Sequence, residues 1–117
     1  MIAALLLLIG TTTPVSCATT SVQSELNDCA LAEFNRADAA LNRQWKITFR
    51  TIWARSSVEA KKLRTAQRAW ISYRDSRCDA DFPWDLGVSL DKMMNINCRT
   101  RLTIERTDVL KRIAKGI

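Results

Sequence analysis

The sequence of 117 residues contains no histidine. Histidine is the most frequent general base in enzymes and the most frequent ligand of catalytic zinc, so its absence argues against triad hydrolysis and metal-dependent hydrolysis. Only three glycines are present, and none forms a glycine-rich loop that could hold a phosphate group. The four cysteines fit neither a C-x-x-C redox pair nor the spacing of zinc ligands. We therefore expect no enzymatic activity, no cofactor and no metal site.

Long apolar runs are also missing, apart from one short segment at the start. Ile2 to Gly10 is apolar but too short to span a membrane, and a segment with Thr, Pro and Ser follows it. This pattern is typical of a secretory signal, although the usual preceding positive residues are absent. We predict a signal peptide over about residues 1–16, a single domain over residues 17–117, and a periplasmic or secreted location.

Cys17 allows a second interpretation of the same segment. The tetrapeptide Pro14-Val15-Ser16-Cys17 is close to a bacterial lipobox, in which the cysteine carries a lipid anchor. Pro14 is a poor fit, because leucine usually stands at that position. A lipid anchor at Cys17 is therefore the less favoured alternative to a structural role.

The charge balance is positive, with 18 Lys and Arg against 12 Asp and Glu, a net charge of +6. The first charged residue is Glu25, so removal of a leader would not change this balance. Charges of both signs occur along the predicted helices, and no nucleic-acid-binding motif is present, so we expect no nucleic-acid partner. Weak association with anionic cell-wall polymers or membrane surfaces remains open.

Apolar residues recur at steps of three and four, the spacing of one helical face, in three segments. The first segment runs from about Ser21 to Arg55, the second contains Leu63 to Cys78, and the third begins near Ser89. This pattern predicts an all-α, disulfide-stapled three-helix bundle with a long first helix. The residues expected on the buried faces are Leu26, Ala30, Phe34, Ala37, Leu41, Trp45, Phe49 and Ile52, then Leu63, Ala66, Trp70 and Tyr73, then Leu90, Met94, Cys98, Leu102, Val109 and Ile113.

Two capping-box patterns predict where helices begin. Thr20 and Gln23 place the start of the first helix close to Ser21, and Ser56 with Glu59 marks a short turn into the second. A turn this short makes the first two helices antiparallel neighbours.

Four cysteines in an exported chain predict two disulfides, which allow three pairings. In an antiparallel hairpin Cys78 lies level with Phe34, so Cys17 would be about 20 Å away at about 1.5 Å per residue, which disfavours a Cys17 to Cys78 bond. We prefer Cys17 with Cys29 and Cys78 with Cys98, each worth about 3 kcal/mol by loop entropy. Pairing of Cys29 with Cys98 remains open if those helices run side by side.

Seven polar residues border the predicted apolar faces. We expect an interhelical network in which Arg74 or Arg106 meets Asp38 and fixes the register of the helices, because buried charges need partners. The alternative is a recognition patch on the surface. The seven residues are Asp38, Asn42, Gln67, Arg74, Asp75, Thr103 and Arg106.

The segment DFPWDLGV, residues 81–88, is predicted to be a loop because of its proline and glycine. It places Phe82 and Trp84 beside Asp81 and Asp85, and exposed aromatic residues are frequent anchors for protein partners. We regard this loop as a candidate partner-binding site. The alternative is that Trp84 folds back and covers the end of the bundle.

Three blocks of the sequence resemble the lysozyme-inhibitor LprI family of small secreted helical proteins. The blocks are Glu25 to Phe34 with Ala37 to Asn42, then Leu63 to Cys78, then Cys98 to Thr107. The resemblance implies a protein that binds lysozyme and blocks its sugar-binding cleft with a loop or a helix end. The alternative, from the residues alone, is a structural or adaptor protein of the cell envelope.

Overall fold

The computed structural model describes residues 17–83 and 89–117, and these residues form three helices without any strand. Helix α1 spans Gln23–Arg55, α2 spans Ser57–Asp81 and α3 spans Ser89–Lys115. The predicted all-α bundle with a long first helix is confirmed. The predicted signal peptide lies outside the described residues.

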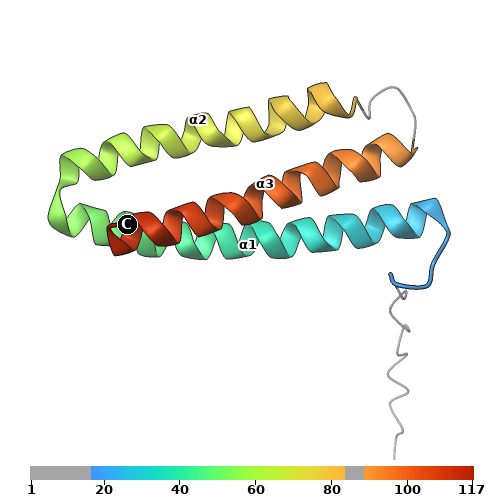
Figure 1. Cartoon of the computed structure of the whole chain (residues 1–117), viewed down its shortest axis with the longest axis horizontal. Helices are drawn as coiled ribbons and strands as arrows, with labels where there is room; N and C mark the ends of the chain where they lie inside the picture. The colour runs from blue at the N-terminus through green and yellow to red at the C-terminus, as the bar shows by residue number, and fades with distance from the viewer. Residues whose placement is uncertain (1–16, 84–88) are drawn as a thin grey trace, which may run out of the picture.

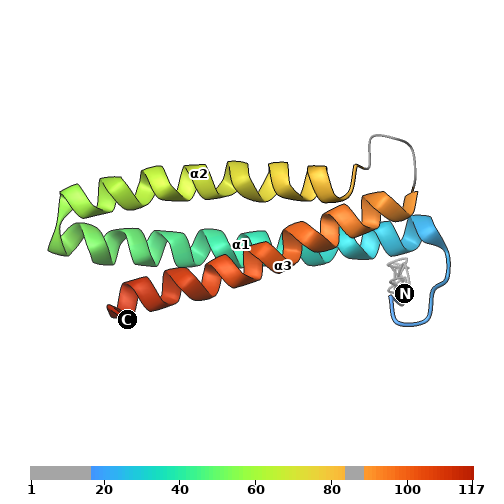
Figure 2. The same ribbon diagram turned by 45° about the horizontal axis from the view of Figure 1, so that its top comes forward.

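The three helices run up, down and up (Figure 1). Helix α1 has 33 residues and is about 50 Å long at about 1.5 Å per residue. Helix α3 runs parallel to α1 and lies beside it in both views, while α2 returns antiparallel (Figure 2). The contact between α1 and α3 includes Thr48, whose buried Oγ1 donates to the carbonyl oxygen of Leu110 at 2.9 Å.

The turn between α1 and α2 has the predicted cap. Ser56 is the N-cap of α2, and its side chain accepts a hydrogen bond from the backbone N–H of Glu59 at 3.2 Å. The capping box predicted for α1 is wrong, because Val22 is the N-cap there and no side chain caps it. Thr20 instead donates to the Glu25 carboxylate and accepts from the backbone N–H of Val22. The segment before α1 therefore folds back on the first helical turn.

The interior of the bundle is small and about as polar as it is apolar. Leu41, Leu110 and Ala60 are almost fully buried, and Cys78, Cys98 and Leu102 form a separate apolar cluster. Among the described residues, every fully buried side-chain nitrogen and oxygen has a hydrogen-bond partner, as buried polar groups require. The buried polar residues are Asn27, Thr48, Gln67, Arg74, Asn95, Thr100, Thr103 and Thr107.

The buried face of α2 differs from the predicted one. Tyr73 and Ala66 are exposed, and Trp70 is only half-buried. Gln67 and Arg74, which were expected to flank the apolar face, lie at its centre. The prediction was wrong because it assigned the interior to apolar side chains, whereas polar side chains with matched partners fill it.

The start of α3 also departs from the predicted pattern. Leu90 and Met94 are exposed, whereas Cys98 and Leu102 further along the helix are buried as expected. Leu110, which the pattern did not select, is fully buried against α1. Steps of four advance slightly more than the 3.6-residue turn, so a strict series of fours rotates around the helix and leaves the interior.

Candidate functional site

Arg74 is the centre of a polar network that joins all three helices. Its Nε donates to Oδ1 of Asp75 at 2.9 Å, and its Nη1 donates to Oγ1 of Thr103 on α3 at 3.3 Å. The same Nη1 lies 3.6 Å from Oδ1 of Asp38 on α1. The Arg74 side chain is only 8% exposed, so these contacts hold a buried charge at the middle of the bundle.

Aromatic rings from two helices cover the Arg74 guanidinium. Its central carbon lies 5.4 Å from the ring centroid of Phe34 on α1 and 5.4 Å from that of Trp70 on α2. A guanidinium over an aromatic face is attracted by the ring quadrupole, more so when water is excluded. The carboxylates and the rings together offset the cost of burying this cation.

Arg99 extends the network toward the end of α2. Its Nη1 donates to Asp75 at 3.0 Å and its Nη2 to Asp79 at 2.7 Å. Its Nε donates to Oδ1 of Asn95 at 2.9 Å. Asp75 is therefore shared by two arginines, one from α2 and one from α3.

Asn95 closes the end of α2 with its side chain. Its Nδ2 donates to the carbonyl oxygens of Cys78 at 3.1 Å and Phe82 at 3.0 Å, and it also reaches Asp79 at 2.9 Å. The Cys78 carbonyl also accepts from the backbone N–H of Phe82 at 2.9 Å, so the Asn95 amide is a second donor there. The same amide supplies a donor to the Phe82 carbonyl, which lies just beyond the end of the helix. Sequence reasoning missed Asn95 and Arg99, because no local pattern links them to residues some twenty positions earlier.

Two arginines have shifted pKa values. Burial lowers the pKa of Arg106, whose Nε donates to Oε1 of Gln67 at 2.9 Å and whose guanidinium lies 5.8 Å from the Trp70 ring centroid. A hydrogen bond to the Tyr73 hydroxyl raises the pKa of Arg77. Arginine titrates far above neutral pH, so both side chains remain charged.

The structure divides the seven predicted network residues into two groups and leaves one apart. Asp38, Arg74, Asp75 and Thr103 contact one another at the centre, with Arg74 meeting Asp38. Gln67 and Arg106 form a separate pair one to two turns toward the hairpin. Asn42 is exposed and lies apart from both, because a step of four residues past Asp38 rotates it toward solvent.

Both disulfides lie at the end of the bundle opposite the turn at Ser56. Cys17 bonds Cys29 and Cys78 bonds Cys98, with Cα atoms 5.9 Å and 5.8 Å apart. These are the pairs preferred from the sequence. A sulfur in a disulfide cannot also carry a thioether-linked lipid, so this pairing and a lipid anchor at Cys17 exclude each other.

The predicted partner-binding loop is described only in part. Phe82 is half-buried and packs against the Cys78–Cys98 cluster, so it is less exposed than expected, and its part in partner binding stays a prediction. Asp81 is the last residue of α2 and is exposed, with Oδ2 3.7 Å from Nε of Arg77. Trp84 and Asp85 lie outside the described residues.

Charge is distributed unequally along the bundle, on either side of the level of Arg74. We call residues 39–73 and 104–117 the hairpin end, where twelve Lys and Arg stand against three Asp and Glu. We call the described residues 17–38, 74–83 and 89–103 the acidic end, where six Lys and Arg stand against eight Asp and Glu. The net charge of +6 is therefore the sum of unequal parts, with about +9 at the hairpin end and about −2 in the described residues of the acidic end.

Within residues 17–83 and 89–117, no group of three or more His, Cys, Asp or Glu side chains could hold a metal ion. None of the helices in these ranges combines the length and the apolar composition needed to cross a bilayer.

Comparison with known proteins gives two matches. The family model described as "Lysozyme inhibitor LprI" matches residues 16–110. An uncharacterized protein of Rhizobium meliloti (strain 1021), R02472, is 32% identical over 104 residues, which cover 80% of this chain and 75% of that protein. No solved structure matches.

Proposed function

Because this chain belongs to the lysozyme inhibitor LprI family, we propose that it is a periplasmic or secreted protein that binds a lysozyme and blocks its sugar-binding cleft. The observation that carries this proposal is the family match across residues 16–110, nearly the whole described domain. Two disulfides in a small domain support the location, because such bonds persist in oxidising compartments. The protein would act as a binding partner rather than as an enzyme.

The charge distribution supports docking through the acidic end. Many lysozymes are strongly basic, so a partner with a net charge of +6 would approach against repulsion if it met them with an average surface. The acidic end removes this difficulty, because its net charge is negative and Asp81 is exposed there. We place the contact at this end, with Trp84 and Asp85 of the connecting loop as proposed contributors.

The rigidity of the acidic end supports the same choice. The Cys78–Cys98 bond, the Asn95 amide and the Arg99 guanidinium fix the end of α2 against α3. A surface that is already ordered loses less conformational entropy when it binds. This end is therefore suited to a shape-complementary contact with a cleft.

The test is a titration of the purified, oxidised protein against a panel of lysozymes, with cell-wall hydrolysis and direct binding both measured. We expect stoichiometric inhibition that loses only part of its strength between low and physiological salt, because shape complementarity is screened less than charge attraction. Unchanged lysozyme turnover at large molar excess would contradict the proposal.

Matched charge reversals can locate the contact. Asp28→Lys with Asp81→Lys alters two exposed carboxylates at the acidic end, and Arg43→Glu with Arg50→Glu alters two exposed cations at the hairpin end. The first pair should slow association with a basic lysozyme by about tenfold, whereas the second should leave it equal or faster. The reverse order would place the contact at the hairpin end.

A further inference from the structure

The hairpin end carries a dense group of cations on α1 and α2. On α1, Lys46 and Arg50 follow each other at a step of four, and no acidic residue occurs between Asp38 and Glu59. On α2, Lys61, Arg64 and Arg68 recur at steps of three and four, so they also share a side. All five are exposed, and we call them the cationic hairpin face: Lys46, Arg50, Lys61, Arg64 and Arg68.

Aromatic side chains of α1 face the cations of α2. Trp45, Phe49 and Trp53 occupy successive turns of α1, with ring centroids 5.3 Å and 5.8 Å apart. Lys61 lies 5.9 Å from the Trp53 ring centroid and Arg64 lies 5.6 Å from that of Phe49. These contacts show that the cations of α2 face the rings of α1.

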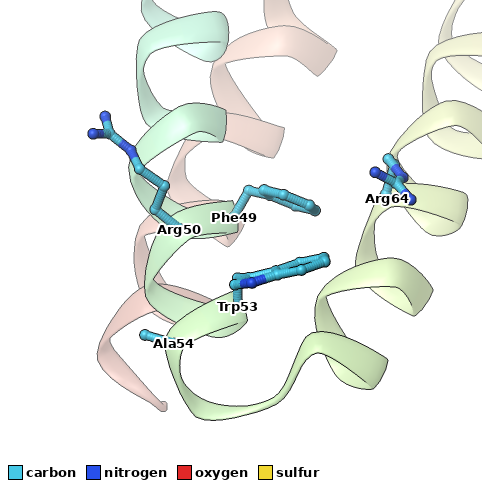
Figure 3. Close-up of a pocket in the computed structure, with 5 residues that line it drawn as sticks. All are labelled: Phe49, Arg50, Trp53, Ala54 and Arg64. Atoms are coloured by element: carbon cyan, nitrogen blue, oxygen red, sulfur yellow. The ribbon is translucent and has the colours of Figure 1, made fainter.

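The rings are accessible rather than enclosed. Trp53 is 45% exposed, and Figure 3 shows the Phe49 and Trp53 rings on successive turns, both directed from α1 toward Arg64 of α2. A shallow cavity of about 430 Å³ opens here, lined by Phe49, Arg50, Trp53, Ala54 and Arg64. The Trp53 indole and the Arg64 guanidinium therefore border one open hollow. Arg50 also lines it, but its guanidinium points away from the rings and its Nε donates to the carbonyl oxygen of Lys46 at 3.3 Å.

We propose that the cationic hairpin face binds the surface of an anionic phospholipid bilayer. Lys and Arg near an anionic leaflet are attracted to its headgroups, and Trp favours the boundary between headgroups and acyl chains. Arg50 and Arg64 would pair with lipid phosphates, while Trp53 enters the boundary layer. This proposal does not depend on lysozyme inhibition.

Charge favours one orientation on such a surface. The hairpin end is attracted to an anionic bilayer and the acidic end is repelled, so the molecule should dock with the turn at Ser56 toward the membrane. The end with both disulfides would then point away from the bilayer. A soluble anionic polymer would use the same cations, but it offers no apolar layer for the exposed part of Trp53, which favours the bilayer.

The test uses the oxidised protein and vesicles of phosphatidylglycerol mixed with phosphatidylcholine, compared with phosphatidylcholine alone. The test variant is Arg50→Gln with Lys61→Gln and Arg64→Gln. The control removes three exposed cations at the acidic end by Arg36→Gln, Arg77→Gln and Arg101→Gln, so both proteins lose the same charge. Far-ultraviolet circular dichroism checks that both remain folded.

We expect binding to the anionic vesicles alone, weakened at least about tenfold in the test variant and less than about threefold in the control, since each surface cation contributes a factor of about five. Tryptophan emission should shift to the blue on binding, and Trp53→Phe should remove most of that shift.

Three results would overturn the proposal. One is the absence of binding to anionic vesicles, and another is equal weakening in both triple variants, which would indicate only net charge. The third is vesicle binding without a blue shift in Trp53 emission, together with binding to soluble dextran sulfate as strong as binding to the vesicles. That result would assign the face to an anionic polymer.

Discussion

The two ends of this bundle are built in different ways. The acidic end is fixed by two disulfides and by directional bonds such as those of Asn95 to the carbonyl oxygens of Cys78 and Phe82. In the described residues of the hairpin end there is no disulfide, and hydrogen bonds such as Thr48 to Leu110 and Arg106 to Gln67 join its helices. Its exposed cations Lys61 and Arg64 reach α1 only through aromatic rings. Directional bonds fix one geometry, whereas exposed cations over rings tolerate several.

This difference suggests a division of labour between the ends. A fixed geometry suits a shape-complementary protein partner, because little order has to be gained on binding. A dense cationic surface suits an extended anionic partner, which is recognised by charge rather than by shape. Arg74 lies at the boundary, where it joins all three helices.

Four changes test this comparison, and removal of the Cys78–Cys98 bond should lower the free energy of unfolding the most. The double change Cys78→Ala and Cys98→Ala removes a disulfide that joins residues 20 positions apart, so the unfolded chain gains conformational entropy. It also leaves a small cavity, and the free energy of unfolding should fall by about 3 kcal/mol or slightly more. Urea denaturation followed by circular dichroism measures this. The matched pair Cys17→Ala and Cys29→Ala should cost less, because Cys17 is exposed and precedes the packed helices. An equal or greater loss in the matched pair would show that the N-terminal bond is the main constraint.

Loss of Arg74 should have the next largest effect. Arg74→Met keeps apolar packing between Phe34 and Trp70 but leaves Asp38 and Asp75 without this partner. Because both carboxylates are more than a third exposed, water solvates them, and we expect a loss of about 2 kcal/mol rather than the larger cost of breaking a fully buried pair. Thermal or urea unfolding measures it, with the exposed Arg36→Met as control. If Arg74→Met left the free energy of unfolding unchanged or raised it, the cost of burying this charge would be at least as large as the stabilisation from its contacts.

The helices and their order were predictable from the sequence because they depend on local spacing. Steps of three and four located all three helices, and Ser56 with Glu59 marked the turn through a cap that needs only four residues of context. The level of each cysteine along an antiparallel hairpin disfavoured a Cys17 to Cys78 bond, and short loops favoured the observed pairs, while a Cys29 to Cys98 bond stayed open. Each of these inferences uses short-range rules of backbone geometry.

The interior was less predictable because its polar members are buried by distant partners. Gln67 and Arg74 count as surface residues in any hydropathy pattern. Partners on other helices explain their burial, Arg106 for Gln67 and both Asp38 and Thr103 for Arg74. The apolar pattern therefore placed the buried face of α2 too far around the helix, on the side of Tyr73, which is exposed. The network could be suspected from polar residues bordering an apolar face, but its geometry required the arrangement of the helices.

Asn95→Ala tests whether the acidic end depends on its directional bonds. The change removes the donor to the Cys78 and Phe82 carbonyls and should lower the unfolding free energy by about 1.5 kcal/mol, because these buried acceptors lose a partner. Hydrogen exchange should increase in the last turn of α2 in particular. Asn97→Ala, at an exposed position of the same helix, is the matched control and should change little. Equal effects of the two substitutions would mean that the disulfide alone fixes this end.

Ser56→Ala is the corresponding change at the hairpin end and should have the smallest effect of the four. It removes the side-chain acceptor of the Glu59 N–H, so a loss of about 1 kcal/mol is expected for an N-cap. Ser57→Ala, one residue later and not a cap, should be close to neutral. If the ends are built differently, Ser56→Ala should leave lysozyme inhibition unchanged while increasing hydrogen exchange in the first turn of α2. A clear loss of lysozyme inhibition in Ser56→Ala would instead mean that the two ends act as one cooperative unit, and the division between them would have to be abandoned.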